Sequence, residues 1–374
     1  MRVADRTLFE DMKILRELAQ EAGKLAQSFM LGGQTAETWH KSGGSPVTEA
    51  DMAVNQLCSN RLTRFRPEYG WLSEETLDDP HARQKDRCWV VDPIDGTRAY
   101  IRGDPHWCIG LAIVEEGISV GGVLYAPELD EFYEAHRGQG AFLNGAAIRV
   151  SECAAEAGCR LIAAETMLEH PGWPEPWPPV TVARPKPNST LLRMAFVAAG
   201  KWDATLVLGQ KADWDLAAGT ILIEEAGGVA TTHRGEKLIF NRAVPAQRSV
   251  IASGNALHPL LVRRSEFVDI PDPQERAPKM VPPATTEPAK MGDTTRETKQ
   301  LLHIVFGGEL KDVTEVEFED LSKVDFVGAF PNYKEAYDAW KNAAQRTVDN
   351  AETRYFILHA HKLLDPETGD HHHV

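Results

Sequence analysis

The first 30 residues carry apolar side chains at intervals of three and four positions. The apolar series comprises Leu8, Met12, Leu15, Leu18, Ala22, Leu25 and Phe29. This spacing predicts an amphipathic helix that ends before Gly32-Gly33. A second helical pattern follows residues 47–51 and stops at Pro67. We expect these two helices to precede the first strand.

Short apolar runs separated by turn residues come next. Cys88–Val91, Cys108–Val114 and Ser119–Tyr125 predict strands of one sheet. After Ser151, strand-like segments alternate with helical patterns at Thr190–Gly200 and Trp214–Ala226. Helices and mixed sheets arranged in layers fit this order of elements.

The pattern changes near residue 271. Prolines alternate with charged residues up to Pro288, and large apolar residues are almost absent, which predicts a linker. Beyond it, residues 301–306 and 355–358 predict strands and residues 333–348 predict a helix. We therefore divide the chain into a domain at 1–270, a Pro-rich linker at 271–298, a small α+β domain at 299–366 and a disordered His-containing tail at 367–374.

Composition and charge narrow the class of function. The chain has 374 residues, of which 43% are hydrophobic and 25% charged, as in ordinary soluble proteins. Its net charge of −15 argues against a nucleic acid polymer as partner. An acidic chain can still act on a phosphorylated metabolite if carboxylates gather around bound cations.

The chain shows no signal for a membrane or for secretion. No run of about 18 apolar residues occurs, and the N-terminus is charged, so we expect a cytoplasmic protein without a membrane partner. Its five cysteines form no Cys-x-x-Cys pair. We therefore expect reduced thiols and neither a disulfide framework nor a zinc site.

Acidic residues lie at the ends of predicted elements in three places. They are Glu74-Glu75 after Trp71-Leu72-Ser73, Asp92 and Asp95 on either side of Pro93-Ile94, and Asp215 after Trp214 at a predicted helix start. Pro93 predicts a tight bend that aims Asp92 and Asp95 at one point, and converging carboxylates suit Mg²⁺. If Gly96 and Thr97 open a helix, their amides add an anion site. A surface turn held by side-chain hydrogen bonds is the alternative explanation of this string.

Four ordered motifs resemble the inositol monophosphatase superfamily from about residue 10 to 265. They are Ser45-Pro46-Val47-Thr48-Glu49-Ala50-Asp51, Glu74-Glu75, Asp92-Pro93-Ile94-Asp95-Gly96-Thr97 and Trp214-Asp215-Leu216-Ala217-Ala218-Gly219 with Glu225-Ala226-Gly227-Gly228. The resemblance implies a layered α/β fold, an αβαβα sandwich, followed here by the small α+β domain. It also implies that two or three Mg²⁺ ions are bound by Glu74, Asp92, Asp95, Asp215 and the backbone carbonyl of Ile94.

The resemblance also implies a catalytic mechanism. Asp51 pairs with Thr97, Thr97 and Glu74 position the attacking water, and Gly96 with Thr97 binds phosphate; no covalent phosphoenzyme forms. Metal ions that activate water and neutralise phosphoryl charge suit such a reaction. We therefore expect a Mg²⁺-dependent phosphomonoesterase. A non-catalytic phosphometabolite sensor is the alternative, against which the complete set of carboxylates argues.

The substrate is less well specified. Leu208 stands where inositol monophosphatases commonly have an acidic residue, whereas Ser45-Pro46, Arg98 and residues 123–127 look more like 3'(2'),5'-bisphosphate nucleotidases. Residues 96–101 are also similar to histidinol-phosphate phosphatases. We rank adenosine 3',5'-bisphosphate first, inositol 1-phosphate second and histidinol phosphate third, with Arg98 as a candidate substrate contact.

Other basic residues and the C-terminal part have a plainer interpretation. Arg184 and Lys186 could contact substrate, but basic residues in such a position more often solubilise a loop. Residues from about 299 to 366 resemble a small domain of unknown function from alphaproteobacteria. It could mediate subunit contact or regulation, or cover the active site as a lid. The family resemblance is compatible with a homodimer.

Overall fold

The computed structural model describes residues 3–30, 38–40, 46–170 and 172–276, and shorter stretches of the C-terminal part at 303–309, 318–320, 323–330, 336, 339–340 and 353–358. The chain divides into two compact units, Met1–Met280 and Val281–Val374. Most of the predicted linker and the whole predicted tail at 367–374 lie outside the described residues.

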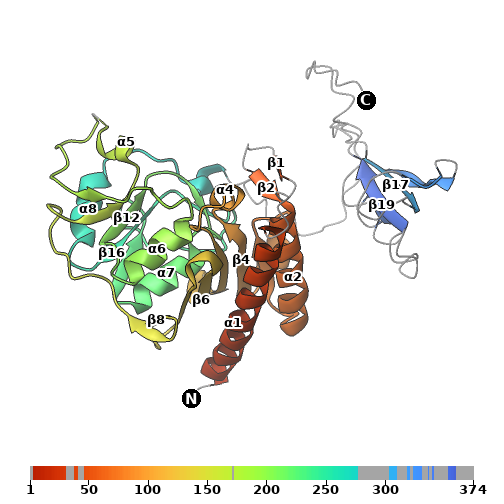
Figure 1. Cartoon of the computed structure of the whole chain (residues 1–374), viewed down its shortest axis with the longest axis horizontal. Coiled ribbons are helices and arrows are strands. Elements are labelled where there is room, and N and C mark those ends of the chain that lie inside the picture. Colours follow the sequence, from red (N-terminus) through yellow and green to blue (C-terminus); the bar gives the residue numbers. More distant parts are fainter. Residues whose placement is uncertain are drawn as a thin grey trace, which may run out of the picture. The chain divides into compact units, whose positions relative to one another are not determined.

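Two antiparallel helices form the first layer of the N-terminal unit (Figure 1). Helix α1 (Val3–Met30) starts before the predicted Leu8, and α2 (Glu49–Phe65) follows Thr48 directly. Strands β1 (Thr38–His40) and β2 (Pro46–Thr48) pair between the helices. The expectation that both helices precede the first strand was wrong, because three-residue strands are too short to show an alternating pattern.

A seven-stranded sheet forms the second layer. In spatial order its strands are β3 (Gly70–Ser73), β4 (Arg87–Asp95), β5 (Cys108–Glu115), β6 (Ile118–Ala126), β7 (Glu131–His136), β8 (Ala141–Leu143) and β9 (Ala146–Ile148). Only β3 and β4 run parallel within this sheet. Trp89 and Val91 of β4 pack with α1 and α2, while Cys88 and Val90 belong to the core on the other face. Both faces of the sheet are therefore covered.

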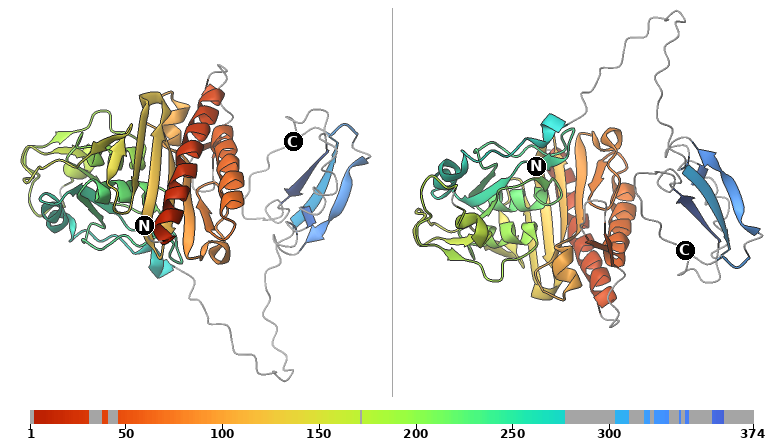
Figure 2. Two further views of the ribbon diagram at one scale, coloured as in Figure 1. Left: turned by 90° about the horizontal axis from the view of Figure 1, so that it is seen from below. Right: turned by 90° about the horizontal axis from the view of Figure 1, so that it is seen from above.

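Two helices and a second sheet complete the core. Helices α6 (Thr190–Ala198) and α7 (Ala217–Glu225) lie between the first sheet and the second, as Figure 2 shows. The strand order of the second sheet is β11 (Thr181–Val182), β10 (Arg160–Ile162), β12 (Ala204–Val207), β16 (Val250–Gly254) and β14 (Gly228–Thr231). Helix α8 (His258–Ser265) packs on the outer face of this sheet through Leu261 and through Leu257, the residue just before the helix. The predicted αβαβα sandwich is confirmed.

Short elements connect these layers. They are α3 (Pro80–Arg83), α4 (Thr97–Ile101), η1 (Pro127–Leu129), α5 (Glu165–Leu168) and η2 (Pro273–Arg276), with β13 (Lys211–Ala212) paired to β15 (Ala246–Gln247). None of the helices in the described part of the chain is both long and apolar enough to cross a bilayer.

The C-terminal unit contains a three-stranded antiparallel sheet. Strand β17 (His303–Glu309) pairs with β18 (Asp325–Phe330) on one side and β19 (Thr353–Leu358) on the other. Strands β17 and β19 overlap the predicted ones, whereas β18 was not predicted. Of the predicted helix at 333–348, residues 336, 339 and 340 are described, and they are helical.

Candidate active site

Three of the predicted acidic residues meet at one point. Each of Asp92, Asp95 and Asp215 places a carboxylate oxygen within 4.8 Å of the other two. Asp92 and Asp95 are buried, and the Asp215 side chain is 18% exposed. We call these three residues the acidic cluster. Oxygen ligands of this kind are those that hard divalent cations prefer.

Strand β4 brings Asp92 and Asp95 to the cluster in a way that differs from the prediction. The strand does not stop at a tight bend before Pro93; it continues to Asp95. Its register with β5 shifts between Asp92, opposite Gly110, and Asp95, opposite Cys108. Proline is tolerated at such a bulge because the ladder hydrogen bond is interrupted there. The bulge turns both carboxylates to the same place.

The charged form of Asp92 is the least compensated in the acidic cluster. Among the described residues neither of its carboxylate oxygens has a hydrogen-bond donor, although both are buried. Burial first, and then the charges of Glu74 and Asp95, raise the pKa of Asp92 well above its ordinary value. A buried carboxylate without donors is costly. A bound cation would relieve this cost.

Asp95 is held by the start of α6. Its Oδ2 accepts hydrogen bonds from Ser189 Oγ at 2.7 Å and from the Leu191 backbone N–H at 2.6 Å. Burial and the charge of Asp215 still raise the pKa of Asp95, while Lys211 opposes the rise. Ser189 was not predicted as part of the site. Its position before a helical pattern marks it as a helix cap, but nothing local in the sequence points to Asp95.

Asp215 lies in the turn before α7. The prediction placed it at a helix start, but α7 begins two residues later at Ala217. Asp215 Oδ2 accepts from the Ala212 N–H at 3.0 Å and forms an ion pair with Lys211 at 3.5 Å. The turn leaves its carboxylate partly exposed beside the buried pair.

Asp51 and Thr97 are brought together, as the family resemblance implies. Asp51 Oδ2 closes a capping box at the start of α2, where it accepts from the Thr48 N–H at 2.8 Å and the Thr48 hydroxyl at 2.6 Å. Asp51 Oδ1 lies 3.2 Å from Thr97 Oγ1. The Thr97 hydroxyl also lies 3.1 Å from the Ile94 carbonyl, and its one proton can serve only one of the two. Burial raises the pKa of Asp51 to about 6.

Gly96 and Thr97 begin the short helix α4, which lies beside β2 (Figure 1). Gly96 has φ of 97°, in the region that favours glycine, and an added Cβ would lie 3.1 Å from the His106 carbonyl. The first intrahelical bond is donated by the Ala99 N–H to the Gly96 carbonyl. The amides of Gly96 and Thr97 therefore precede the hydrogen-bonded turn. Arg98 is exposed on this helix.

Glu74 follows β3 and lies outside the three-residue cluster. Its backbone N–H donates to the Val91 carbonyl at 3.3 Å, which anchors it to β4. Its charge contributes to the raised pKa of both Asp92 and Asp51. Glu74 is therefore within electrostatic range of both parts of the site.

Basic residues adjoin the acidic cluster, and two of them were missed in the sequence. Arg193, only 8% exposed in α6, donates to the carbonyls of Pro187 at 2.7 Å and Asn188 at 2.8 Å, and it feels the charges of Asp95 and Asp215. Partial desolvation, and then the charges of Arg193 and Lys211, lower the pKa of Lys186, whose side chain still reaches solvent. We call Lys186, Arg193 and Lys211 the basic group. Arg193 could have been noticed in the sequence, because it is the one charged residue in the apolar segment Leu191–Ala198.

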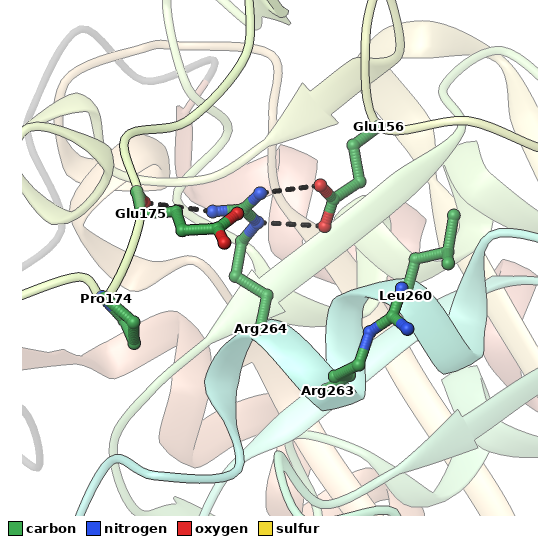
Figure 3. A pocket seen from close by; sticks show the side chains of 6 residues that line it. All are labelled: Glu156, Pro174, Glu175, Leu260, Arg263 and Arg264. Atoms are coloured by element: carbon green, nitrogen blue, oxygen red, sulfur yellow. Dashed lines mark hydrogen bonds and ion pairs between the residues drawn. The ribbon is translucent and has the colours of Figure 1, made fainter.

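A hollow of about 270 Å³ borders the basic group. It is lined by residues 163–166 and 183–186 and so includes Lys186. A separate hollow of about 450 Å³, shown in Figure 3, contains none of the cluster residues. There Arg264 is already bound by Glu156 and by the Glu175 carbonyl. The smaller hollow is therefore the better place for part of a substrate.

Comparisons with known proteins agree with this arrangement. The model of the Inositol monophosphatase family matches residues 8–269, and that of a domain of unknown function, DUF4170, matches residues 301–360. A histidinol-phosphatase of Chlorobaculum parvum is 32% identical over 62% of this chain and 89% of its own length. An inositol-1-monophosphatase of Mesorhizobium japonicum is 31% identical over 64% of this chain and 92% of its own length.

Solved structures show the same fold. The extragenic suppressor protein SuhB of Bartonella henselae superposes with a TM-score of 0.59 at 26% identity, over 70% of this chain and all of that one. The inositol monophosphatase of Thermotoga maritima gives a TM-score of 0.57 at 30% identity, over 70% of this chain and 97% of that one. The chain therefore belongs to the inositol monophosphatase family, whose members are phosphatases that hydrolyse phosphomonoesters.

Proposed function

We propose that this protein is a Mg²⁺-dependent phosphatase that removes one phosphate from a small metabolite carrying two, with adenosine 3',5'-bisphosphate as the first candidate. The observation that carries the choice of substrate is the basic group beside the acidic cluster. The cluster would serve the phosphate that is cleaved, and the basic group would serve the one that stays.

The acidic cluster fits a divalent cation. Asp92 has two buried oxygens without donors among the described residues, and it is surrounded by other carboxylates. Mg²⁺ would be held by Asp92, Asp95, Asp215, Glu74 and the carbonyl of Ile94, the ligands that the family resemblance implies. When bound, it supplies a lowered pKa for the attacking water and neutralises charge on the phosphoryl group.

Thr97 and Asp51 would guide the attacking water. Thr97 donates its proton to Asp51 and accepts one from water, while Glu74 orients the same water. As the water oxygen forms its bond to phosphorus, the ester P–O bond breaks and the water proton passes through Thr97 to Asp51. The leaving oxygen takes a proton from solvent. The 3.2 Å separation of Thr97 Oγ1 and Asp51 Oδ1 supports this path.

The phosphate to be cleaved would bind against the start of α4. The amides of Gly96 and Thr97 precede the first hydrogen-bonded turn and suit phosphate oxygens. Arg98 follows them on an exposed position and is a candidate contact for the substrate. A guanidinium there would add charge-assisted hydrogen bonds.

The phosphate that stays would be held by the basic group. Lys186 lines the 270 Å³ hollow, where the nucleoside would fit, and lies within electrostatic range of Arg193 and Lys211. Histidinol phosphate carries an ammonium group, which these positive charges would repel. Leu208 offers no acidic side chain to sugar hydroxyls. Inositol 1-phosphate remains the second candidate, because the relative from Mesorhizobium japonicum is named for that activity.

Phosphate release measures the proposal directly. We would compare adenosine 3',5'-bisphosphate, inositol 1-phosphate and histidinol phosphate at matched concentrations, with Mg²⁺ and with a chelator. We expect the bisphosphate to be preferred by more than about tenfold, or about 1.4 kcal/mol, and no release with the chelator. Preference for either of the others would overturn the choice of substrate. If no phosphate is released from any of the three esters, the result would favour the alternative that the protein is a non-catalytic phosphometabolite sensor.

A variant pair tests the role of the basic group. Lys186→Ala should raise KM for adenosine 3',5'-bisphosphate about tenfold, because one charge-assisted contact is lost. It should leave KM for adenosine 3'-phosphate unchanged, since that substrate lacks the second phosphate. The exposed Lys237, whose charge acts on Glu224, gives the matched control Lys237→Ala. Equal changes with both substrates would contradict the proposed contact.

A further inference from the structure

A fully buried arginine ties the segment after Glu74 to a distant loop. Arg83 ends α3 and is 0% exposed. On its own segment it donates to Asp78 through Nε and Nη2, the latter at 3.1 Å. Across the molecule it donates to the backbone carbonyls of Arg242 at 2.8 Å and Ala243 at 2.9 Å. The guanidinium therefore joins residues 78–83 to residues 241–243.

Asn241 extends this connection toward Asp215. Its Oδ1 accepts from Arg83 Nη1 at 2.9 Å, and its Nδ2 donates to the Arg83 carbonyl at 3.0 Å. Its backbone N–H donates to Asp213 Oδ2 at 2.6 Å. Gln247 Nε2 donates to the other Asp213 oxygen at 2.8 Å. Polar contacts thus run without a break from Arg83 to Asp213.

Asp213 shapes the turn that carries Asp215. Its backbone carbonyl accepts the N–H groups of Leu216 at 3.2 Å and Ala217 at 2.9 Å, where α7 begins. Strand β13 just before it pairs with β15, which holds Gln247. The Asp213 side chain is 0% exposed. Its position therefore sets where Asp215 enters the acidic cluster.

We propose that Arg83, Asn241 and Asp213 are positioning residues for the metal site. They hold the segment after Glu74 and the turn with Asp215 at a fixed distance, although none of them belongs to the predicted ligands. Burying Arg83 and Asp213 is costly, and apolar packing would join the two segments without that cost. Polar partners behind metal ligands preorganise the site for the ion. This inference rests on the proposed metal site.

The test is Mg²⁺ binding by isothermal titration calorimetry with the full chain. Arg83→Lys loses the forked geometry that reaches several acceptors at once. Asn241→Gly removes only the side-chain link: Asn241 has φ of 55°, which glycine adopts readily, and the N–H to Asp213 stays. Arg264→Lys is the matched control. Arg264 also donates to one carboxylate through two nitrogens, that of Glu156, and to one backbone carbonyl, that of Glu175, in the hollow of Figure 3.

We expect Arg83→Lys and Asn241→Gly to raise the Mg²⁺ dissociation constant about tenfold or more, and Arg264→Lys to change it less than about twofold. If Arg83→Lys does not fold, Asn241→Gly decides the question alone. Unchanged Mg²⁺ affinity in Asn241→Gly would overturn the positioning role. Asp95→Asn distinguishes failure of the positioning role from failure of the proposed metal site. Undiminished Mg²⁺ binding in that variant would show that the acidic cluster does not bind Mg²⁺.

Discussion

Asp92 illustrates how a single residue serves binding at the expense of stability. It is 1% exposed, lacks hydrogen-bond donors among the described residues, and lies among the charges of four other carboxylates. In the metal-free protein this arrangement favours the protonated form of Asp92. Residues of this kind are retained for function, because the fold alone would be more stable without them.

Replacing Asp92 should reveal this conflict. We expect Asp92→Asn to raise the unfolding free energy of the metal-free protein by roughly 1–3 kcal/mol, since an amide is neutral without having to take up a proton on folding. The same variant should lose the stabilisation that Mg²⁺ gives the native protein. Thermal unfolding with Mg²⁺ and with a chelator measures both effects. Asp269→Asn, at a side chain 95% exposed, is the control and should change neither. A less stable metal-free Asp92→Asn protein would refute the expectation.

The Thr97 hydroxyl should matter for the rate more than for metal binding. Thr97→Ala removes the group that lies between Asp51 and the Ile94 carbonyl. We expect kcat to fall about 10²-fold or more, while the Mg²⁺ concentration for half-maximal activity stays within about threefold. Thr97→Ser keeps the hydroxyl and should recover most of the rate. A normal kcat in Thr97→Ala would exclude the proposed proton path.

At the scale of elements, one residue at the start of α2, Asp51, both caps the helix and belongs to the candidate active site. Asp51 completes the capping box with Thr48 and at the same time faces Thr97. Its pKa rises from 3.8 to about 6, mainly through burial. The folded protein therefore binds more protons than the unfolded chain between about pH 4 and pH 6, so its stability falls as pH rises through this range.

We expect the metal-free protein to lose about 2 kcal/mol of unfolding free energy from Asp51 between pH 4 and pH 6. Urea unfolding in a chelator at several pH values measures this slope. Saturating Mg²⁺ should reduce the slope, because the cation favours the ionised carboxylates of the site. In Asp51→Asn the slope should be smaller even without Mg²⁺. Stability that rises with pH in the chelator, with no difference between the two proteins, would contradict this account.

Periodic elements could be predicted from the sequence, and irregular ones could not. The α1 stripe and the strands β5 and β6 follow from apolar spacing, so their positions were predicted closely. The bulge in β4 was read as a bend, because Pro93 is compatible with both and only the register with β5 distinguishes them. The two-residue strands β11 and β13 are too short to leave a pattern.

The same distinction holds for the site. Asp92, Asp95 and Asp215 stand in motifs with a family resemblance, and the structure brings them together. Ser189, Arg193 and Lys211 carry no local motif. They join the site because the start of α6 contacts Asp95 and because Lys211 pairs with Asp215. The role of Arg83 was harder still to predict, because its partners in the distant loop, such as the Ala243 carbonyl, are up to 160 residues away in the sequence.

At the scale of the whole molecule, the acidic cluster and the basic group both come from the N-terminal unit, Met1–Met280. SuhB of Bartonella henselae is matched over its whole length by 70% of this chain. A chain of the length of the N-terminal unit is therefore sufficient for the fold. The C-terminal unit has a sheet of its own, in which Phe326 is 63% exposed.

Deleting residues 281–374 should accordingly leave catalysis intact. We expect kcat, the Mg²⁺ requirement and the ranking of the three phosphate esters to remain within about twofold of the full chain, because every residue proposed to act on substrate stays. Phosphate release and light scattering on the same samples measure turnover and assembly together. Intact turnover with a smaller assembly would assign subunit contact to the C-terminal unit. An altered ranking of substrates would instead require that this unit reaches the active site, and the prediction would fail, since the basic group alone could not then account for specificity.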